Sequence, residues 1–187
     1  MTLLLLIAVL GASPDGGALC NDDLIAPVVR AHRAANKRGA DGWLALQKSA
    51  DDLAARLSTR KLGATAVSEL QNRLNACLPE MGIRLQYCEI GSRWKAGSEG
   101  FAQSLAVAPN GPHADEAYWQ TEVETRACGD FEPSVTAYRD GVQRYEAFLR
   151  RFPSSRLRSR AERQLTLYRS GLEHELAVAG ADADGGR

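Results

Sequence analysis

Apolar residues recur at helical spacing along most of this chain. The pattern predicts an N-terminal group of three helices over residues 24–37, 43–57 and 65–78, separated by Gly39 and Gly63. Each helix has an apolar face and polar residues at its start. The first part of the chain is therefore expected to form a helical bundle.

Residues 83–90 depart from helical spacing. Ile83, Leu85 and Tyr87 alternate with Arg84 and more polar neighbours, which is a period of two. Because an isolated strand would have no partner in a helical chain, we expect a helix or an extended linker here. The same stretch, which ends at a glycine, is where we expect the N-terminal region to end.

The second half of the chain carries a weak internal repeat at a spacing of 44 residues. Its first copy comprises Trp94, Lys95, Gly97, Phe101, Leu105, Pro109, Ala117 and Gln120, and its second comprises Tyr138, Arg139, Gly141, Tyr145, Leu149, Pro153, Ala161 and Gln164. Each copy predicts an aromatic-rich helix, a proline-marked break, and a second helix with a small alanine at its packing position. Stacked helical hairpins produce such a signal, because no single hairpin can bury its apolar face alone.

This organisation predicts an all-α protein, with an N-terminal helical bundle followed by stacked helical hairpins. The expected segments are a signal peptide over 1–18, a helical region over 19–92, the hairpins over 93–176, and a disordered tail over 177–187. The tail is rich in alanine, glycine and aspartate, a composition that does not bury a core.

The repeat half resembles the tetratricopeptide-repeat class over residues 94–170. The resemblance rests on Ala114–Trp119, Gly129–Phe131, Tyr145–Ser155 and Ala161. It is strongest to exported repeat proteins of the bacterial cell envelope, such as the Tol-Pal-associated periplasmic protein and the repeat lipoprotein of the outer-membrane assembly machine. The resemblance implies hairpins that hold a protein partner, but it assigns no ligand-contacting residue.

The chain departs from that class in two places. Gln120 and Thr121 stand where the family has Leu-Gly, and Cys128 directly precedes the Gly-Asp turn. Two hairpins are also fewer than the three that a stable array usually needs. The N-terminal helices would then have to cap the array, and cysteines would have to staple it.

The N-terminus has the pattern of a secretory signal peptide. Leu3–Leu10 is an uninterrupted apolar run, too short to span a membrane, and Gly16, Gly17 and Ala18 offer small residues for cleavage after Ala18. We therefore expect export, in a bacterial setting to the periplasm. Lipidation at Cys20 is an alternative, disfavoured because the bulky Leu19 precedes it, and a membrane is an expected partner only in that case.

Four cysteines, Cys20, Cys77, Cys88 and Cys128, remain after this cleavage. An even number in an exported protein indicates disulfides. The short loop favours Cys77–Cys88 with Cys20–Cys128, while the pairings that join Cys128 to Cys77 or to Cys88 remain open. Zinc-ligand spacing is absent, because there is no C-x-x-C pair and the three histidines are scattered.

The composition excludes a strong general attraction to nucleic acid, because the formal net charge of the 187 residues is zero. One local stretch is basic, and its candidate anion-binding side chains are Arg150, Arg151, Arg156, Arg158 and Arg160. They predict either a solvated helix face or a patch for an anionic partner.

The sequence contains no G-x-S-x-G, H-E-x-x-H, P-loop or G-x-G-x-x-G motif. We therefore expect no catalytic residue, cofactor or metal. The expected function is a non-enzymatic cell-envelope scaffold or adaptor that binds a protein or peptide partner and no nucleic acid. The alternative is a periplasmic enzyme or enzyme inhibitor without a recognisable signature.

Overall fold

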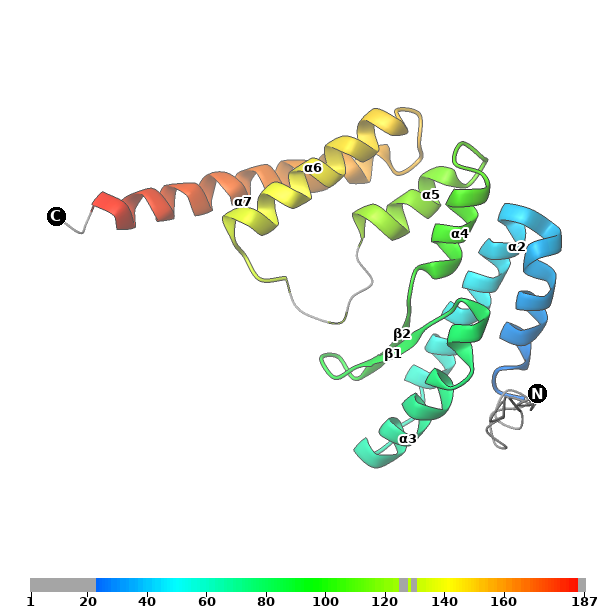
Figure 1. Ribbon diagram of the computed structural model, residues 1–187. Helices are drawn as coiled ribbons and strands as arrows, with labels where there is room; N and C mark the ends of the chain where they lie inside the picture. The colour runs from blue at the N-terminus through cyan, green and yellow to red at the C-terminus, as the bar shows by residue number, and fades with distance from the viewer. Residues whose placement is uncertain (1–22, 125–127, 129–130, 185–187) are drawn as a thin grey trace, which may run out of the picture.

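The computed structural model describes residues 23–124, 128 and 131–184 of the chain, so the predicted signal peptide and Cys20 lie outside the described residues. Most of the described chain is helical, and a two-stranded antiparallel sheet is its other element (Figure 1). A mainly helical class is therefore confirmed, although the sheet makes the all-α prediction incomplete. Within these residues no helix is both long enough and apolar enough to cross a membrane.

Helix α2 (Ala26–Ser58) consists of two helical segments that meet at Gly39, as its glycine predicted. Gly39 has φ 60° and ψ −138°, a backbone conformation that glycine adopts without the penalty that other residues incur. The two segments run side by side in opposite directions (Figure 1). Gly42 allows this tight reversal, since a Cβ atom there would collide with the backbone of Ala35.

Helix α3 (Ala64–Asn75) and the short 3₁₀ helix η1 (Leu78–Met81) follow, and Gly82 reverses the chain at φ 68°. The alternating stretch then forms strand β1 (Leu85–Cys88), which pairs with β2 (Arg93–Ala96). The expected helix or linker at residues 83–90 is therefore wrong. The missing partner is the segment just beyond Gly91, which the 44-residue spacing had assigned to a repeat helix.

Two helical side chains stabilise this small sheet, one at each outer edge. Gln71 of α3 binds β1, and the hydroxyl of Ser58 in α2 accepts a hydrogen bond of 2.8 Å from the Trp94 backbone N–H of β2. Across the strands, the rings of Tyr87 and Trp94 meet edge to face at 5.5 Å. A lone two-stranded hairpin is marginal in water, so these contacts account for its place in the core.

The first hydrophobic core joins α2, α3, η1 and the hairpin. Its fully buried members include Val28, Leu46, Leu53, Leu57 and Ile83. Trp94 and Ala96 belong to this core as well, so it extends past the expected boundary at residue 92, which falls in the turn between the strands. The hairpin is thus part of the N-terminal core.

A buried amide connects this core to the next helix. Gln47 of α2 is fully buried, donates to the Gly97 carbonyl at 2.7 Å, and accepts from the Gly100 N–H at 3.0 Å. Gly100 lies in the first turn of α4 (Glu99–Val107), where backbone N–H groups lack helical partners. A Cβ at Gly100 would lie 2.8 Å from the Gln47 Cβ, so the approach requires glycine.

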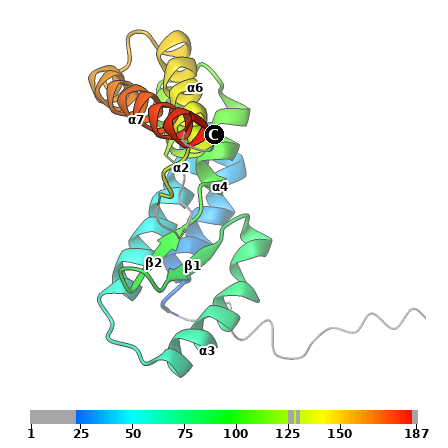
Figure 2. The same cartoon turned by 90° about the vertical axis from the view of Figure 1, so that its left-hand side faces the viewer.

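The second core lies at the other end of the molecule (Figure 2). Helix α5 (Ala114–Tyr118) continues into the π-helix η2 (Trp119–Val123), and helices α6 (Val135–Arg151) and α7 (Arg158–Asp184) form a long hairpin. Ser134 caps α6 by accepting a hydrogen bond from the Ala137 N–H at 3.1 Å. Trp119, Phe148 and Ala161 are buried at the centre of this core.

Two glycines let α6 and α7 approach closely. A Cβ at Gly141 of α6 would overlap the ring of Tyr168 in α7, and a Cβ at Gly171 of α7 would overlap the ring of Tyr138 in α6. At each of these glycines, an aromatic ring of one helix packs directly against the backbone of the other helix. This reciprocal contact sets the distance between the two helices.

The 44-residue spacing corresponds to equivalent structure only from α4 onward. Pro109 and Pro153 each stand just past the C-cap residue of a helix, and Ala117 and Ala161 are both fully buried in the next helix. Trp94, however, lies in strand β2, whereas its counterpart Tyr138 lies in α6. At the other end, α7 remains helical through Asp184, so a disordered tail over residues 177–184 is not what the structure shows.

We expect Ala161→Leu to lower the free energy of unfolding by about 1–3 kcal/mol, because extra methyl groups overpack a filled core. Ala161 is fully buried against Trp119 and Phe148. Ala179→Leu, at an exposed position of the same helix, is the matched control and should change stability by less than about 0.5 kcal/mol. Equal melting curves for the two variants would show that the packing at Ala161 is misassigned.

We expect Gln47→Met to cost about 3 kcal/mol in guanidinium unfolding. Methionine preserves the volume, but the Gly97 carbonyl and the Gly100 N–H lose their partner inside the protein. Gln103→Met, on the exposed face of α4, is the control for the same change of side chain. A loss below about 1 kcal/mol at position 47 would contradict this account of the amide.

Candidate functional site

A groove of about 490 Å³ lies between α3 and the outer edge of β1, and we call it the β1–α3 groove. Its walls come from two segments close in sequence, joined through η1. The lining residues are Val67, Ser68, Gln71 and Asn75 on the helix, and Arg84, Leu85, Gln86, Tyr87 and Glu89 on the strand side. The helix wall thus presents short or flexible side chains toward a strand edge.

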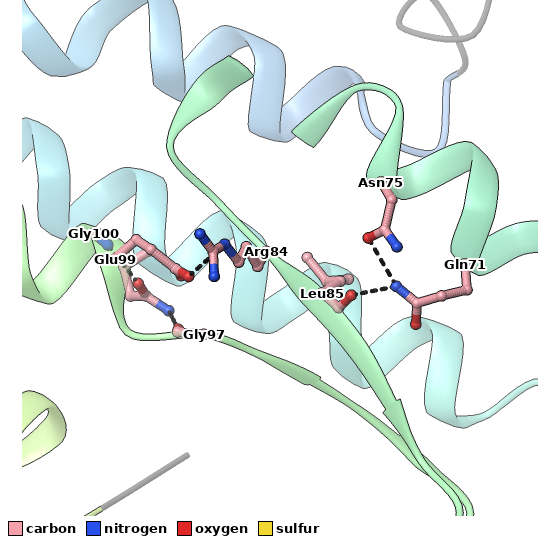
Figure 3. Close-up of polar contacts among 8 residues, drawn as sticks. Gln71, Asn75, Arg84, Leu85, Gly97, Glu99 and Gly100 are labelled. Carbon is pink, nitrogen blue, oxygen red and sulfur yellow. Dashed lines mark hydrogen bonds and ion pairs between the residues drawn. The ribbon is translucent and has the colours of Figure 1, made fainter. Parts of the chain in front are cut away.

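The Gln71 side chain crosses this groove (Figure 3). Its Nε2 donates to the Leu85 carbonyl at 2.6 Å and to the Asn75 side-chain oxygen at 3.0 Å. Its Oε1 accepts from the Tyr87 backbone N–H at 2.9 Å. One amide therefore satisfies both a donor and an acceptor of the strand.

The register of the hairpin explains why these two groups face the groove. Residues of β1 alternate in direction, and the Arg84 carbonyl accepts from the Gly97 N–H on the β2 side at 2.9 Å. Leu85 and Tyr87, one residue out of phase, direct their backbone groups to the opposite edge. The groove therefore contains a row of strand-pairing groups, which can bind a peptide group.

The rim of the groove carries both signs of charge. Arg84 has a 79% exposed side chain and forms an ion pair with Glu99 at 3.7 Å (Figure 3), and Glu89 lies at the other end of the strand. Neither charge lies inside the hydrogen-bonding edge. The groove can therefore bind a neutral main chain without desolvating an isolated charge.

A second hollow, of about 510 Å³, lies between the two cores. It is lined by residues of α2, β2 and η2 and by the residue after η2: Asp51, Ala54, Ala55, Trp94, Lys95, Ala96, Gln120 and Glu124. Its charged residues already have partners: Asp51 accepts from Gln47 at 3.3 Å, Glu124 pairs with Arg160, and Lys95 also has an interaction within the chain. We take the β1–α3 groove as the candidate site, because one side chain, Gln71, bonds both outward backbone groups of its strand edge.

The π-helix beside this hollow carries a buried aromatic cluster. Trp119 is 1% exposed, packs on Phe148 at 5.0 Å, and has the Arg160 guanidinium over its ring. Burial raises the pKa of the neighbouring Tyr145 hydroxyl above its usual value, and Tyr168 and Glu124 raise this pKa further. Tyr145 therefore stays neutral at physiological pH and acts as a packing residue.

The basic stretch proves to be internally paired. Arg150 bridges to Glu146 at 3.7 Å and Arg158 to Glu162 at 2.8 Å, both one helical turn away. The other three candidates reach back to the preceding helices and their turn: Arg151 to the Pro109 carbonyl, Arg156 to Glu116, and Arg160 to Glu124.

These contacts favour the solvated and structural interpretation of the stretch over an anion-binding patch. Arg151 also lies over the rings of Tyr118 and Phe152 at 5.0 Å and 5.3 Å. Nearby, Ser155 donates to Asp115 at 2.6 Å. The two proline-marked turns of the repeat are therefore held against each other by arginine and serine contacts.

The favoured cysteine pairing is wrong, because Cys88 pairs with Cys128 at a Cα–Cα distance of 5.2 Å. Strand β1 runs back along α3, so that Tyr87 bonds Gln71, which lies six residues before Cys77, and Cys88 is carried away from the end of α3. Cys77 is also disulfide-bonded, and Cys20 lies outside the described residues. The Cys88–Cys128 bridge ties the end of β1 to the segment after the π-helix.

Comparisons with protein-family models, with curated proteins and with solved structures found no match for this chain. The candidate site therefore rests on geometry alone. Across the residues that the structure describes, no group of three or more histidine, cysteine or acidic side chains could hold a metal ion.

The sequence alone does not reveal the β1–α3 groove, although it carries part of the signal. The alternation of Leu85 and Tyr87 with polar neighbours indicated a strand. Gln71 gave no such signal, because a polar residue on an amphipathic helix is ordinary. Its role depends on where the strand lies relative to α3.

We expect the double variant Cys88→Ser/Cys128→Ser to lose about 4 kcal/mol of unfolding free energy under oxidising conditions. The bridge joins residues 40 positions apart, and closing a loop of that length restricts the unfolded chain. The difference from wild type should shrink in reductant, because wild type then loses the same bridge. Non-reducing peptide mapping that recovers Cys77 joined to Cys88 would contradict the pairing.

Proposed function

We propose that this protein is a non-enzymatic scaffold of an exported, cell-envelope compartment, and that it binds a protein or peptide partner in the β1–α3 groove. The groove carries the proposal. It combines an accessible volume of about 490 Å³ with strand-edge groups that a peptide can satisfy. Grooves of this kind bind segments of partner proteins through their main chain.

The helical architecture supports a scaffold role. The units α4–α5 and α6–α7 each place a proline-marked turn between two helices, with a buried alanine in the second helix of each unit. We propose that these units are stacked in the tetratricopeptide manner, with the N-terminal core as their cap. The internal pairing of the arginines holds these two units against each other.

Two features support export. The apolar run and small residues at the N-terminus have the form of a signal peptide. The protein has a disulfide between Cys88 and Cys128. Disulfides persist in oxidising compartments and are rare in reducing ones. The proposed location is therefore the periplasm or an equivalent space.

The test is a quantitative pull-down from envelope extract with three forms of the full chain. Wild type should recover a stoichiometric partner, and Ser68→Arg should recover at least tenfold less, because the longer side chain fills the groove from α3. Ser170→Arg, an equal change on the exposed surface of α7, should match wild type.

Equal recovery by both variants would remove the groove from the proposed function. Recovery of no partner by wild type, or turnover of a substrate by the purified chain alone, would overturn the scaffold proposal itself.

A further inference from the structure

We infer that the partner segment binds as an extended strand along the outer edge of β1, in the place that the Gln71 side chain occupies in the free protein. The inference rests on the proposed function and specifies its mode of recognition. The expected partner is a short extended peptide that the protein recognises mainly by hydrogen bonds to the peptide main chain.

The hydrogen bonds of Gln71 carry this inference. Its amide donates to the Leu85 carbonyl and accepts from the Tyr87 N–H, two residues further along β1. One residue of a neighbouring parallel strand presents the same donor and acceptor to the same two groups. The side chain therefore reproduces the pairing pattern of a third strand at this edge.

The other edge of the sheet is organised differently. Ser58 of α2, the helix packed against β2, offers a single hydroxyl to Trp94 there, at 2.8 Å from its N–H and 3.4 Å from its carbonyl. At the β1 edge, Gln71 reaches across an open groove from an adjacent helix. A third strand can therefore join at β1 and is blocked at β2.

The added strand would run alongside β1, about 4.8 Å from it. The four residues of β1 correspond to roughly 13 Å of extended chain. On the helix wall, the exposed Ser68 is short, and Gln71 can rotate away while Asn75 remains in reach of its amide. A segment of four or five residues then replaces each hydrogen bond that Gln71 releases.

Gln71 also explains how the free protein keeps this edge from pairing with other chains. Exposed strand edges promote association with further strands. The Gln71 amide satisfies the Leu85 carbonyl and the Tyr87 N–H without an additional strand. A peptide can therefore displace it by rotation of one side chain. A peptide that binds the wild-type protein must therefore displace the Gln71 amide.

The experiment uses the full-length protein and a phage-displayed library of random heptapeptides as the probe. Selected peptides are synthesised with a single backbone N-methyl group at each position in turn, which removes one N–H donor. We expect affinity to fall at least tenfold at every second position and to change little at the positions between. The Gln71 side-chain NH₂ signals in NMR spectra should shift when the peptide binds.

A second measurement uses Gln71→Ala, which removes the internal competitor. The peptide should bind this variant about 3–10-fold more tightly than wild type, because two hydrogen bonds need not be broken first. Gln103→Ala, on the exposed face of α4, is the control and should bind as wild type does. The affinities of the N-methylated peptides are measured with the wild-type protein, so they test the inference even if Gln71→Ala is unstable.

Several results would overturn strand addition. These are a library that yields no binder, N-methyl effects without alternation, or unchanged or weaker binding by Gln71→Ala. Self-association of Gln71→Ala at the β1 edge without peptide would identify a second copy as the occupant instead. Capture of a Ser68-sensitive envelope partner, with no alternation in the N-methyl series, would leave the scaffold proposal in place.

Discussion

The buried amide of Gln47 holds the two parts of this protein in register. It lies in the second segment of α2, bonds the Gly97 carbonyl at the end of the hairpin, and receives the Gly100 N–H at the start of α4. A buried amide without partners is costly, so these bonds leave the junction little freedom. Helix α4 in turn packs against α2 and α5, and the second core follows from its position.

In the hairpin, too, side chains take the place of missing backbone hydrogen-bond partners. Two strands of four residues would not persist alone. Ser58 satisfies one edge, Gln71 satisfies the other, and the Tyr87 and Trp94 rings fill the space between the strands and the core. The candidate site thus lies where the Gln71 side chain stabilises the β1–β2 hairpin.

Arginine has a mainly structural role in the second core. Arg151 of α6, Arg156 of the following turn and Arg160 of α7 contact the turn before α5, α5 itself and the residue after the π-helix. These contacts join positions 36 to 42 residues apart in the chain. Exposed ion pairs of this kind contribute little stability singly, but several together fix the relative position of helices. The neutral net charge of the chain fits this internal pairing.

Local signals in the sequence determined most of the helices and their ends. Gly39 interrupts α2, Ser134 caps α6, and Pro109 and Pro153 follow helices, because caps and breakers act within a few residues. The buried positions of Ala117 and Ala161 also followed from their place in the repeat.

The tertiary structure alone decided which distant groups meet. The partner of β1, the pairing of Cys88 with Cys128, and the contact of Gln71 with Leu85 and Tyr87 each depend on the distance between separate segments. Periodicity reports which face of an element is apolar, and it does not report which neighbour covers that face. The candidate groove therefore became visible only when α3 and the strand were placed side by side.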